Sequence, residues 1–261
     1  MSIFCPLFSG SSGNSEYIGY GESGVLIDAG VSAKRLTDAM CSNSFDPHAL
    51  LGIFITHEHS DHISGLRVFA KKYGVPVFCS EPTMNALLKD DKLAAEVSII
   101  PFSSKVELGG FTVERFPTSH DCEGSSGYVV HTPDNKRIAV CTDLGYVSDD
   151  VSNAIDGCNL VMLESNHDVS MLRNGSYPYV LKQRIASDKG HLSNACCATE
   201  LVKLIQSGTT RFVLGHLSKE NNRPSLALDS AISFLKLSGY EYNKDYTIEV
   251  ASPCDGKTVI V

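Results

Sequence analysis

The residues of this chain that are best suited to chemistry lie in one short stretch. Three histidines and an aspartate occur within six residues, in the sequence His57-Glu58-His59-Ser60-Asp61-His62. Imidazole nitrogens and carboxylate oxygens are the ligands that zinc, iron and manganese accept. Packing such groups onto one turn is costly unless a cation satisfies them. The stretch therefore predicts a metal site, although a single histidine in a loop would more often be an ordinary surface residue.

Three further residues with metal-binding side chains each follow an apolar segment. His120 comes after residues 111–116, Asp143 after residues 137–142 and His216 after residues 211–214. Any one of them alone would most often be a hydrogen-bonded loop residue. Functional groups are commonly presented at strand ends in α/β proteins, so this shared placement favours one common site.

The segments around these residues read as alternating strands and helices. The cluster at 57–62 follows the apolar run 50–55, which has the composition of a buried strand, and precedes residues with helical spacing. Helices are expected at 32–40, 63–73, 178–187, 192–207 and 224–238, with a short one after Pro82. Strands are expected at 3–8, 17–20, 25–28, 51–56, 75–79, 97–101, 106–108, 111–116, 127–131, 137–142, 160–163, 211–214, 246–251 and 258–261. No linker divides the chain, so we expect one α/β domain over residues 1–261, with two mixed sheets covered outside by helices.

Composition narrows the class of protein further. Hydrophobic residues make up 43% of the 261 residues, enough for a large core, and no apolar run of membrane-spanning length occurs. The first residues lack the pattern of a secretory signal, and nine cysteines are scattered without a CxxC pair, which favours reduced thiols in the cytoplasm. The net charge of −8 argues against nonspecific binding to nucleic acid, but two bound dications would offset about half of it.

The order and spacing of the candidate ligands resemble the five motifs of the metallo-β-lactamase superfamily. The match covers HxHxDH at 57–62, then His120, Asp143 and His216, and so nearly the whole chain. It implies a four-layer αββα sandwich with a dinuclear site at one edge, between the sheets. It also implies two divalent metal ions per chain, zinc first, with manganese or iron as alternatives. The implied ligands are His57, His59 and His120 for one ion and Asp61, His62 and His216 for the other, with Asp143 bridging them.

Three shorter segments resemble the YycJ/WalJ-like bacterial group within this superfamily. They are residues 9–14, 163–168 and 190–194. This resemblance implies a 5′ to 3′ DNA exonuclease or phosphodiesterase. The interval between Asp143 and His216, about 70 residues, leaves no room for the extra domain that β-CASP nucleases insert there.

Several other residues are candidates for contacts with a substrate. His191 precedes an expected helix start, where free backbone N–H groups favour an anion, so it could hold a phosphate or protonate a leaving oxygen. The alternative interpretation is that His191 caps this helix. The candidates for phosphate contacts are His191, Ser193, Asn194, Ser11 and Asn14; those for support of metal ligands are Asp28 and His167; and those for catalysis are Asp61 and His191.

A basic run leads to His191 along the chain. It contains Arg173, Lys182, Arg184 and Lys189, and it is either a solvated helix face or a track for nucleic acid. The serine- and glycine-rich loop at residues 9–15 also has two readings, an ordinary turn or a phosphate site.

Three functions remain open on the sequence. The leading hypothesis is a two-metal phosphodiesterase, a 5′ to 3′ exonuclease on DNA rather than RNA, in which a metal-bridging hydroxide is the nucleophile. The second is hydrolysis of a small molecule such as a cyclic phosphodiester, a thioester or a lactone. The third is a non-catalytic, metal-binding regulatory protein. We expect no membrane association and no obligatory protein partner.

Overall fold

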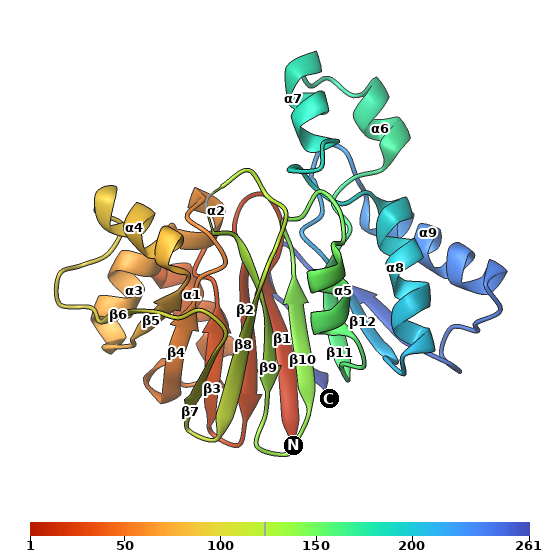
Figure 1. Ribbon diagram of the computed structural model, residues 1–261. Coiled ribbons are helices and arrows are strands. Elements are labelled where there is room, and N and C mark those ends of the chain that lie inside the picture. The colour runs from red at the N-terminus through yellow and green to blue at the C-terminus, as the bar shows by residue number, and fades with distance from the viewer. Residues whose placement is uncertain (123) are drawn as a thin grey trace.

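Two sheets packed face to face form the centre of the computed structural model, which describes residues 1–122 and 124–261 (Figure 1). The first sheet has seven strands in the order β14 (Val259–Ile260), β1 (Ser2–Phe8), β2 (Ser15–Tyr20), β3 (Ser23–Ile27), β4 (Leu50–Phe54), β5 (Val77–Cys79) and β6 (Ile99–Pro101). The second has seven in the order β13 (Thr247–Val250), β12 (Arg211–Gly215), β11 (Leu160–Glu164), β10 (Arg137–Cys141), β9 (Ser126–His131), β8 (Phe111–Pro117) and β7 (Lys105–Leu108).

Both sheets are mixed, as predicted. In the first, β14, β1, β2 and β3 pair antiparallel, and β3 to β6 pair parallel. In the second, β7 to β10 pair antiparallel, and β10 to β13 pair parallel. Parallel strands end at the same edge of a sheet, so each sheet presents several carboxyl ends together.

Apolar side chains alternate between the two faces of each sheet. In β10, Ile138 and Val140 belong to the core between the sheets, whereas Ala139 and Cys141 belong to the core beneath the outer helices. The core between the sheets also contains Phe54 of the first sheet and Tyr128 of the second. This period of two is what a strand buried on both faces requires.

Helices cover the outer face of each sheet. On the first sheet lie α1 (Ala33–Ser42) and α3 (Leu66–Tyr73), with α2 (Ser60–Ile63), α4 (Glu81–Lys89) and the 3-10 helix η1 (Pro47–Ala49) near them. On the second lie α5 (Asp149–Ile155), α8 (Asn194–Gln206) and α9 (Pro224–Leu237). The four layers confirm the predicted αββα sandwich. No helix among the described residues has both the length and the apolar character needed to cross a bilayer.

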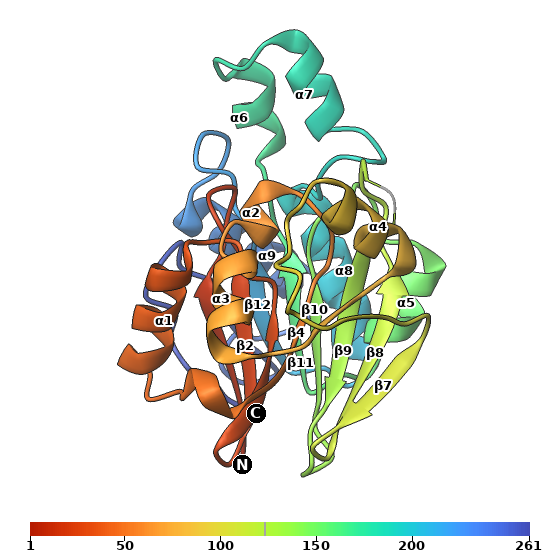
Figure 2. The ribbon, with the colours of Figure 1, turned by 90° about the vertical axis from the view of Figure 1, so that its left-hand side faces the viewer.

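Two short helices stand apart from these layers. In both ribbon views, α6 (Val169–Asn174) and α7 (Tyr179–Ile185) project beyond one end of the sandwich (Figure 1 and Figure 2). We refer to residues 169–186 as the protrusion. The sequence predicted a helix at 178–187 but neither α6 nor α5.

One predicted helix is interrupted. The sequence favoured a single helix over 63–73, but α2 ends at Ile63 and α3 begins at Leu66. The chain passes close to another segment at this break, because a Cβ at Gly65 would lie 2.0 Å from the carbonyl oxygen of Val31. The Gly65 N–H donates to the Ala29 carbonyl oxygen instead of to a helical partner.

Candidate metal centre

The predicted ligands come together at the edge where the strands of both sheets end. Residues 57–62 follow β4, His120 follows β8, Asp143 follows β10 and His216 follows β12. Asp28, Asp143 and His216 leave their strands in the left-handed region of backbone space, with φ of 60°, 58° and 53°. Few residues other than glycine adopt this region, and aspartate and histidine are among those that tolerate it.

The turn at 57–62 is clamped by two neighbouring loops of the first sheet, one between β1 and β2 and the other after β3. The Asn14 N–H donates to the Asp61 carbonyl oxygen at 2.8 Å, and the Ala29 N–H donates to the His62 carbonyl oxygen at 2.8 Å. The loop after β3 can approach the turn this closely because residue 30 is glycine. A Cβ there would lie 1.7 Å from the Asp61 carbonyl oxygen. The position of the turn is thus fixed through its backbone.

The seven predicted ligands form overlapping groups. His57, His59 and His120 offer ligand atoms that lie within 4.8 Å of one another, and so do Asp61, His62 and His216. Asp143 joins the groups, since its carboxylate oxygens lie 3.3 Å from His62 Nε2 and 3.8 Å from His120 Nε2. Two of the groups have the same members as the ligand sets that the resemblance implied, and a third combines Asp143 and His216 with Glu164 and His191.

Four of these histidines are held by a hydrogen bond at Nδ1. The contacts are His57 Nδ1 to Thr56 Oγ1 (3.0 Å), His62 Nδ1 to Asp28 Oδ2 (2.7 Å), His120 Nδ1 to the Gly190 carbonyl oxygen (3.1 Å) and His216 Nδ1 to Glu164 Oε1 (2.7 Å). Metal-binding histidines are commonly oriented in this way, with the other nitrogen directed at the ion.

Among the described residues, three buried atoms of the cluster make no hydrogen bond. They are His57 Nε2, His216 Nε2 and Asp143 Oδ2. Leaving a buried polar atom unpaired costs about 1–3 kcal/mol, and clustering three of them compounds that cost. Once deprotonated, the two imidazole nitrogens and the carboxylate oxygen form a donor set that suits a divalent cation.

Burial and neighbouring charges shift the pKa values of the residues in the cluster in different directions. Burial lowers the pKa of His57 well below its ordinary value, and the adjacent imidazoles lower it further, so this ring is neutral. Burial also disfavours the charged form of His62, but Asp143 and Asp28 outweigh it and raise the pKa to about 9. Burial acts to raise the pKa of Asp61, yet His216 and His62 hold it below its usual range.

Glu164 is the principal residue that sequence reasoning missed. It is fully buried at the end of β11, and its Oε1 accepts from His191 Nδ1 at 2.9 Å and from His216 Nδ1 at 2.7 Å. Its Oε2 accepts from the backbone N–H groups of Leu144 and Leu192. One carboxylate therefore positions two histidines and two loops. The signal was available, because Glu164 ends a buried strand just as Asp143 and His216 follow one.

His191 lies beside the cluster, as the phosphate hypothesis requires. Its ligand atom groups with those of Asp143, Glu164 and His216, and its side chain is 20% exposed. Burial disfavours the charged ring, but Glu164 reverses this and raises the pKa of His191. Asp28 also lies where a support for a ligand was expected, against His62 and Thr56.

The other predicted substrate contacts are placed less favourably. Asn14 is buried, with its Oδ1 accepting from the Gly10 N–H and its Nδ2 3.1 Å from His62 Nε2. The Asn194 side chain is buried and hydrogen-bonded to Ser165 and Asn222. These amides already have partners, because they join loops that the sequence does not show to be adjacent.

Ser11, Ser193 and His167 line cavities. Ser11 borders one beside Tyr177 and Lys219, away from the predicted ligands. Ser193 caps α8 by accepting from the Cys196 N–H, so the helix-cap reading applies to it rather than to His191. We expected His167 to support a metal ligand, but among the described residues its ring makes no hydrogen bond to any of the seven.

The basic run is partly engaged within the protein. Arg184 forms an ion pair with Asp121, whose Oδ1 lies 3.4 Å from His120 Nε2. Lys182 Nζ donates to the carbonyl oxygens of Arg173 and Gly175 and so ties α7 to the end of α6. The ion pair of Arg184 ties the protrusion to the residue beside His120, and the bonds of Lys182 join α6 to α7 within the protrusion.

Comparison with known proteins finds relatives by sequence and similar solved structures. Exodeoxyribonuclease YycJ of Bacillus anthracis is 38% identical over 252 residues, which are 96% of this chain and 95% of that protein. Exodeoxyribonuclease WalJ of Streptococcus pneumoniae serotype 2, strain D39, is 38% identical over 251 residues, 95% of this chain and 93% of the other. Among solved structures, the metallo-β-lactamase fold protein YhfI from Bacillus subtilis has a TM-score of 0.75 at 13% identity, covering 99% of this chain and 98% of that one.

The family model described as Beta-lactamase superfamily domain matches residues 24–217, which include every predicted ligand. The structural likeness supports the fold, and the two relatives confirm the resemblance to the YycJ/WalJ group. The chain therefore belongs to the β-lactamase superfamily, among its metal-dependent hydrolases.

Proposed function

We propose that the protein is an exonuclease that degrades DNA from its 5′ end and depends on two divalent cations. The observation that carries this proposal is the pair of ligand groups that meet at Asp143. The choice of DNA draws its support from YycJ and WalJ, both exodeoxyribonucleases by name, which align with nearly the whole chain. The polarity rests on the resemblance of the sequence to their group.

In this proposal His57, His59 and His120 hold one cation and Asp61, His62 and His216 the other, with Asp143 shared. The unpartnered atoms of His57, His216 and Asp143 fit such an occupant. Zinc is the first candidate for this donor set, and manganese and iron are alternatives. The cations would supply Lewis acidity, activating water at neutral pH and offsetting charge on a phosphate.

The chain's own groups complete the chemistry. Glu164 orients His191 through Nδ1 and leaves the opposite edge of the partly exposed ring free for a phosphate oxygen. Although burial disfavours the charged ring, Glu164 raises the pKa of His191, which favours a proton on the ring that can be donated to the leaving oxygen. The Asp61 side chain is 24% exposed and stays ionised, so it can accept a hydrogen bond from an attacking water.

We place this activity in the cytoplasm. Support comes from the nine cysteines, none of which forms a disulfide bond. Several of them are buried, among them Cys5, Cys79, Cys141 and Cys197. Burial raises the pKa of the Cys79 thiol to about 12, so the group is inert rather than a nucleophile. Unpaired thiols are typical of a reducing compartment.

Purified protein loaded with Mn²⁺ or Zn²⁺ tests the proposal. It is incubated with DNA labelled at the 5′ or the 3′ end, with matching RNA, and with a thioester. We expect mononucleotide release from the 5′ end of DNA, and loss of at least ~100-fold in rate for His191→Ala at unchanged metal content. His131→Ala is the matched control, because His131 is a half-buried histidine that pairs with Glu114 on β8, away from the cluster.

Three outcomes contradict parts of the proposal. Release from the 3′ end alone would overturn the polarity. Faster degradation of RNA would overturn the choice of DNA. Turnover of the thioester without any degradation of nucleic acid would favour the small-molecule hydrolase instead.

A further inference from the structure

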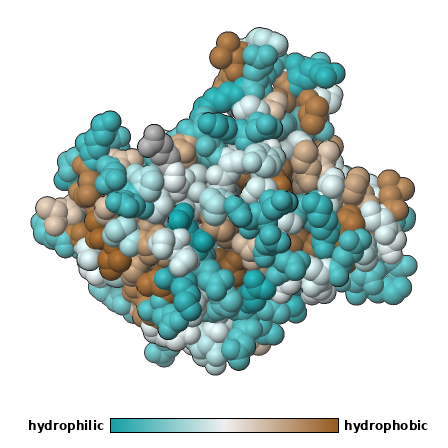
Figure 3. Space-filling model, in the orientation of Figure 1, coloured by the Kyte–Doolittle hydropathy of each residue, from teal (hydrophilic) through white to brown (hydrophobic). Residues whose placement is uncertain are grey.

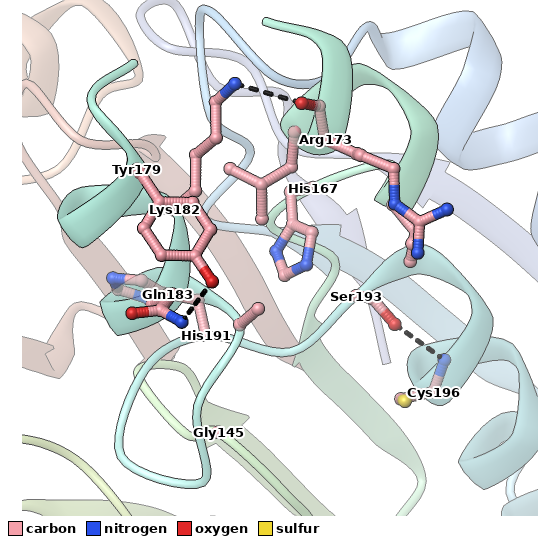
Figure 4. Close-up of a pocket in the computed structure, with 12 residues that line it drawn as sticks. Gly145, His167, Arg173, Tyr179, Lys182, Gln183, His191, Ser193 and Cys196 are labelled. Atoms are coloured by element: carbon pink, nitrogen blue, oxygen red, sulfur yellow. Dashed lines mark hydrogen bonds between the residues drawn. The ribbon is translucent and has the colours of Figure 1, made fainter.

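A cavity of about 430 Å³ lies between the protrusion and the start of α8, beside His191. Its size falls within the range of small-molecule sites, roughly 300–1,000 Å³. The walls come from α6, α7, α8 and the loop before α8 (Figure 4). His191 belongs both to this lining and to the ligand group around Asp143. A molecule in the cavity can therefore be continuous with a phosphate at the candidate metal centre.

The cavity wall contains a buried polar group without a partner. His167 is 3% exposed, and its Nδ1 has no hydrogen bond to any described residue. Figure 4 shows its ring between Tyr179 and Lys182 of α7 and Arg173 of α6. Burial lowers the pKa of His167, so the ring is neutral and presents one N–H donor and one lone pair. Such a ring can pair with the polar edge of a heterocycle.

The rest of the wall suits a flat aromatic ligand. Val169, Leu172 and Ala186 contribute apolar surface. The phenol ring of Tyr179 is 72% exposed although it lines the cavity, and its hydroxyl accepts from Gln183 Nε2 at 2.7 Å. Figure 3 shows that apolar residues also lie on the surface of the protrusion, at the top of the view. An aromatic ring left open to solvent and held at its far end is a ready stacking surface for a base.

Two cations stand at the same cavity. Arg173 and Lys182 both line it, and Lys182 Nζ is fixed by two carbonyl oxygens near the end of α6. Their charge favours an anionic ligand in a protein whose net charge is −8. Apolar walls, an open aromatic ring, a neutral imidazole and positive charge together match a nucleotide better than a purely apolar compound.

From this arrangement we infer that the cavity is a nucleoside subsite, which holds the 5′-terminal nucleoside of the DNA while the phosphate on its 3′ oxygen lies at His191. In this subsite the base stacks on Tyr179, and a ring nitrogen or exocyclic group of the base pairs with His167. The inference rests on the proposed nuclease function and gives the protrusion a role in it. It also accounts for the ion pair of Arg184 with Asp121, which ties the protrusion to the residue beside His120.

Calorimetric titration of the metal-loaded protein tests the subsite directly. The ligands are deoxyadenosine 3′-monophosphate and 1,2-dideoxyribose 3-phosphate, which share the sugar phosphate and differ in the base. We expect the nucleotide to bind about tenfold more tightly, because stacking a base on an aromatic ring gives a gain of this order. Tyr179→Ala should reduce this ratio to near one, and Tyr179→Phe should preserve it.

Val180→Ala is the matched control. Val180 is the next residue of α7, is 77% exposed and does not line the cavity, so its substitution should leave the ratio unchanged. His167→Phe, which fills the space without a hydrogen-bonding nitrogen, should weaken the nucleotide and spare the sugar phosphate.

A kinetic test uses DNA whose terminal residue lacks a base. The wild-type protein should release this residue about tenfold more slowly than a normal one, and Tyr179→Ala should remove the difference. Equal binding of the two small ligands by the wild type, or a ratio that survives Tyr179→Ala, overturns the subsite even if DNA is degraded. Tyr179-dependent binding without any degradation of DNA supports the subsite and overturns the exonuclease function instead.

Discussion

The two sheets contribute to the candidate metal centre in different ways. The first sheet supplies a compact unit, the turn at 57–62 after β4, supported by Asp28 at the end of β3. The second sheet supplies one residue from each of several strand ends, His120 after β8, Asp143 after β10, Glu164 at the end of β11 and His216 after β12. Neighbouring residues fix the first contribution, whereas only correct pairing of the strands assembles the second.

The two carboxylates that hold the candidate ligands in place, Asp28 and Glu164, differ in the same way. Asp28 serves one histidine of the turn and Thr56, both within the first sheet. Glu164 serves His191 and His216 and also binds the backbone of two loops. The dispersed half of the site thus depends on one shared carboxylate, and the compact half does not.

The largest loss of activity is expected when a single metal ligand is removed, whether it comes from the first sheet or from the second. His62→Ala and His216→Ala should each lower exonuclease turnover at least ~100-fold and reduce the metal content measured by mass spectrometry, because both open the same ligand group. His48→Ala, at an exposed histidine of η1, should change neither quantity. Full metal content in either variant would show that its sheet supplies no necessary ligand.

A smaller effect should separate the two supports. Glu164→Gln should lower metal affinity or turnover by about 10–100-fold, a loss typical of groups that orient metal ligands. The new amide would face the N–H groups of Leu144 and Leu192 with a donor. Asp28→Asn should cost less, since it loosens only His62. Competitive zinc titration measures both, and an equal loss in the two variants would contradict the difference between the sheets.

The smallest expected effect is the dependence of zinc affinity on pH. Asp143 and Asp28 raise the pKa of His62 to about 9, so the ring is protonated at neutral pH until a cation displaces the proton. Zinc affinity should therefore rise by at most about tenfold per pH unit for each proton released, up to about pH 9. The charged ring also stabilises the metal-free fold fully below its ordinary pKa of 6.5, and this contribution is lost as the pH rises through 9.

The measurement is a zinc titration at several pH values between about 6.5 and 8.5, with proton release followed in weak buffer. Asp28→Asn should flatten the dependence, because it removes one of the two carboxylates that hold the proton. A pH-independent affinity in the wild type would argue against a protonated His62.

Sequence reasoning predicted the strands and the gathering of the seven candidate ligands well. Both succeed for the same physical reason, since a buried strand is a continuous apolar run and the polar residue that ends it is conspicuous. Glu164 was missed because it is the last residue of β11, whereas the search considered metal-binding residues beyond the strand ends. The same placement rule, extended by one position, would have found it.

Other features could not be read from local pattern. The helix α5 buries only Val151 and Ile155, one turn apart, which is too short for a helical period to emerge, although Ser148 and the acidic residues after it are start signals. Asn14 and Asn194 looked like free polar donors, and only the packing of distant loops shows that their amides are committed. The cavity under the protrusion likewise depends on contacts between segments far apart in the chain.

The left-handed backbone of Asp28, Asp143 and His216 has a consequence for how this chain tolerates change. Each such residue costs on the order of 1 kcal/mol that a glycine would not. Selection for thermal robustness alone would favour glycine or asparagine at these positions, and the protein would lose its ligands as it gained stability. Variants recovered from a stability screen should therefore be sequenced at these three positions before their robustness is credited to packing.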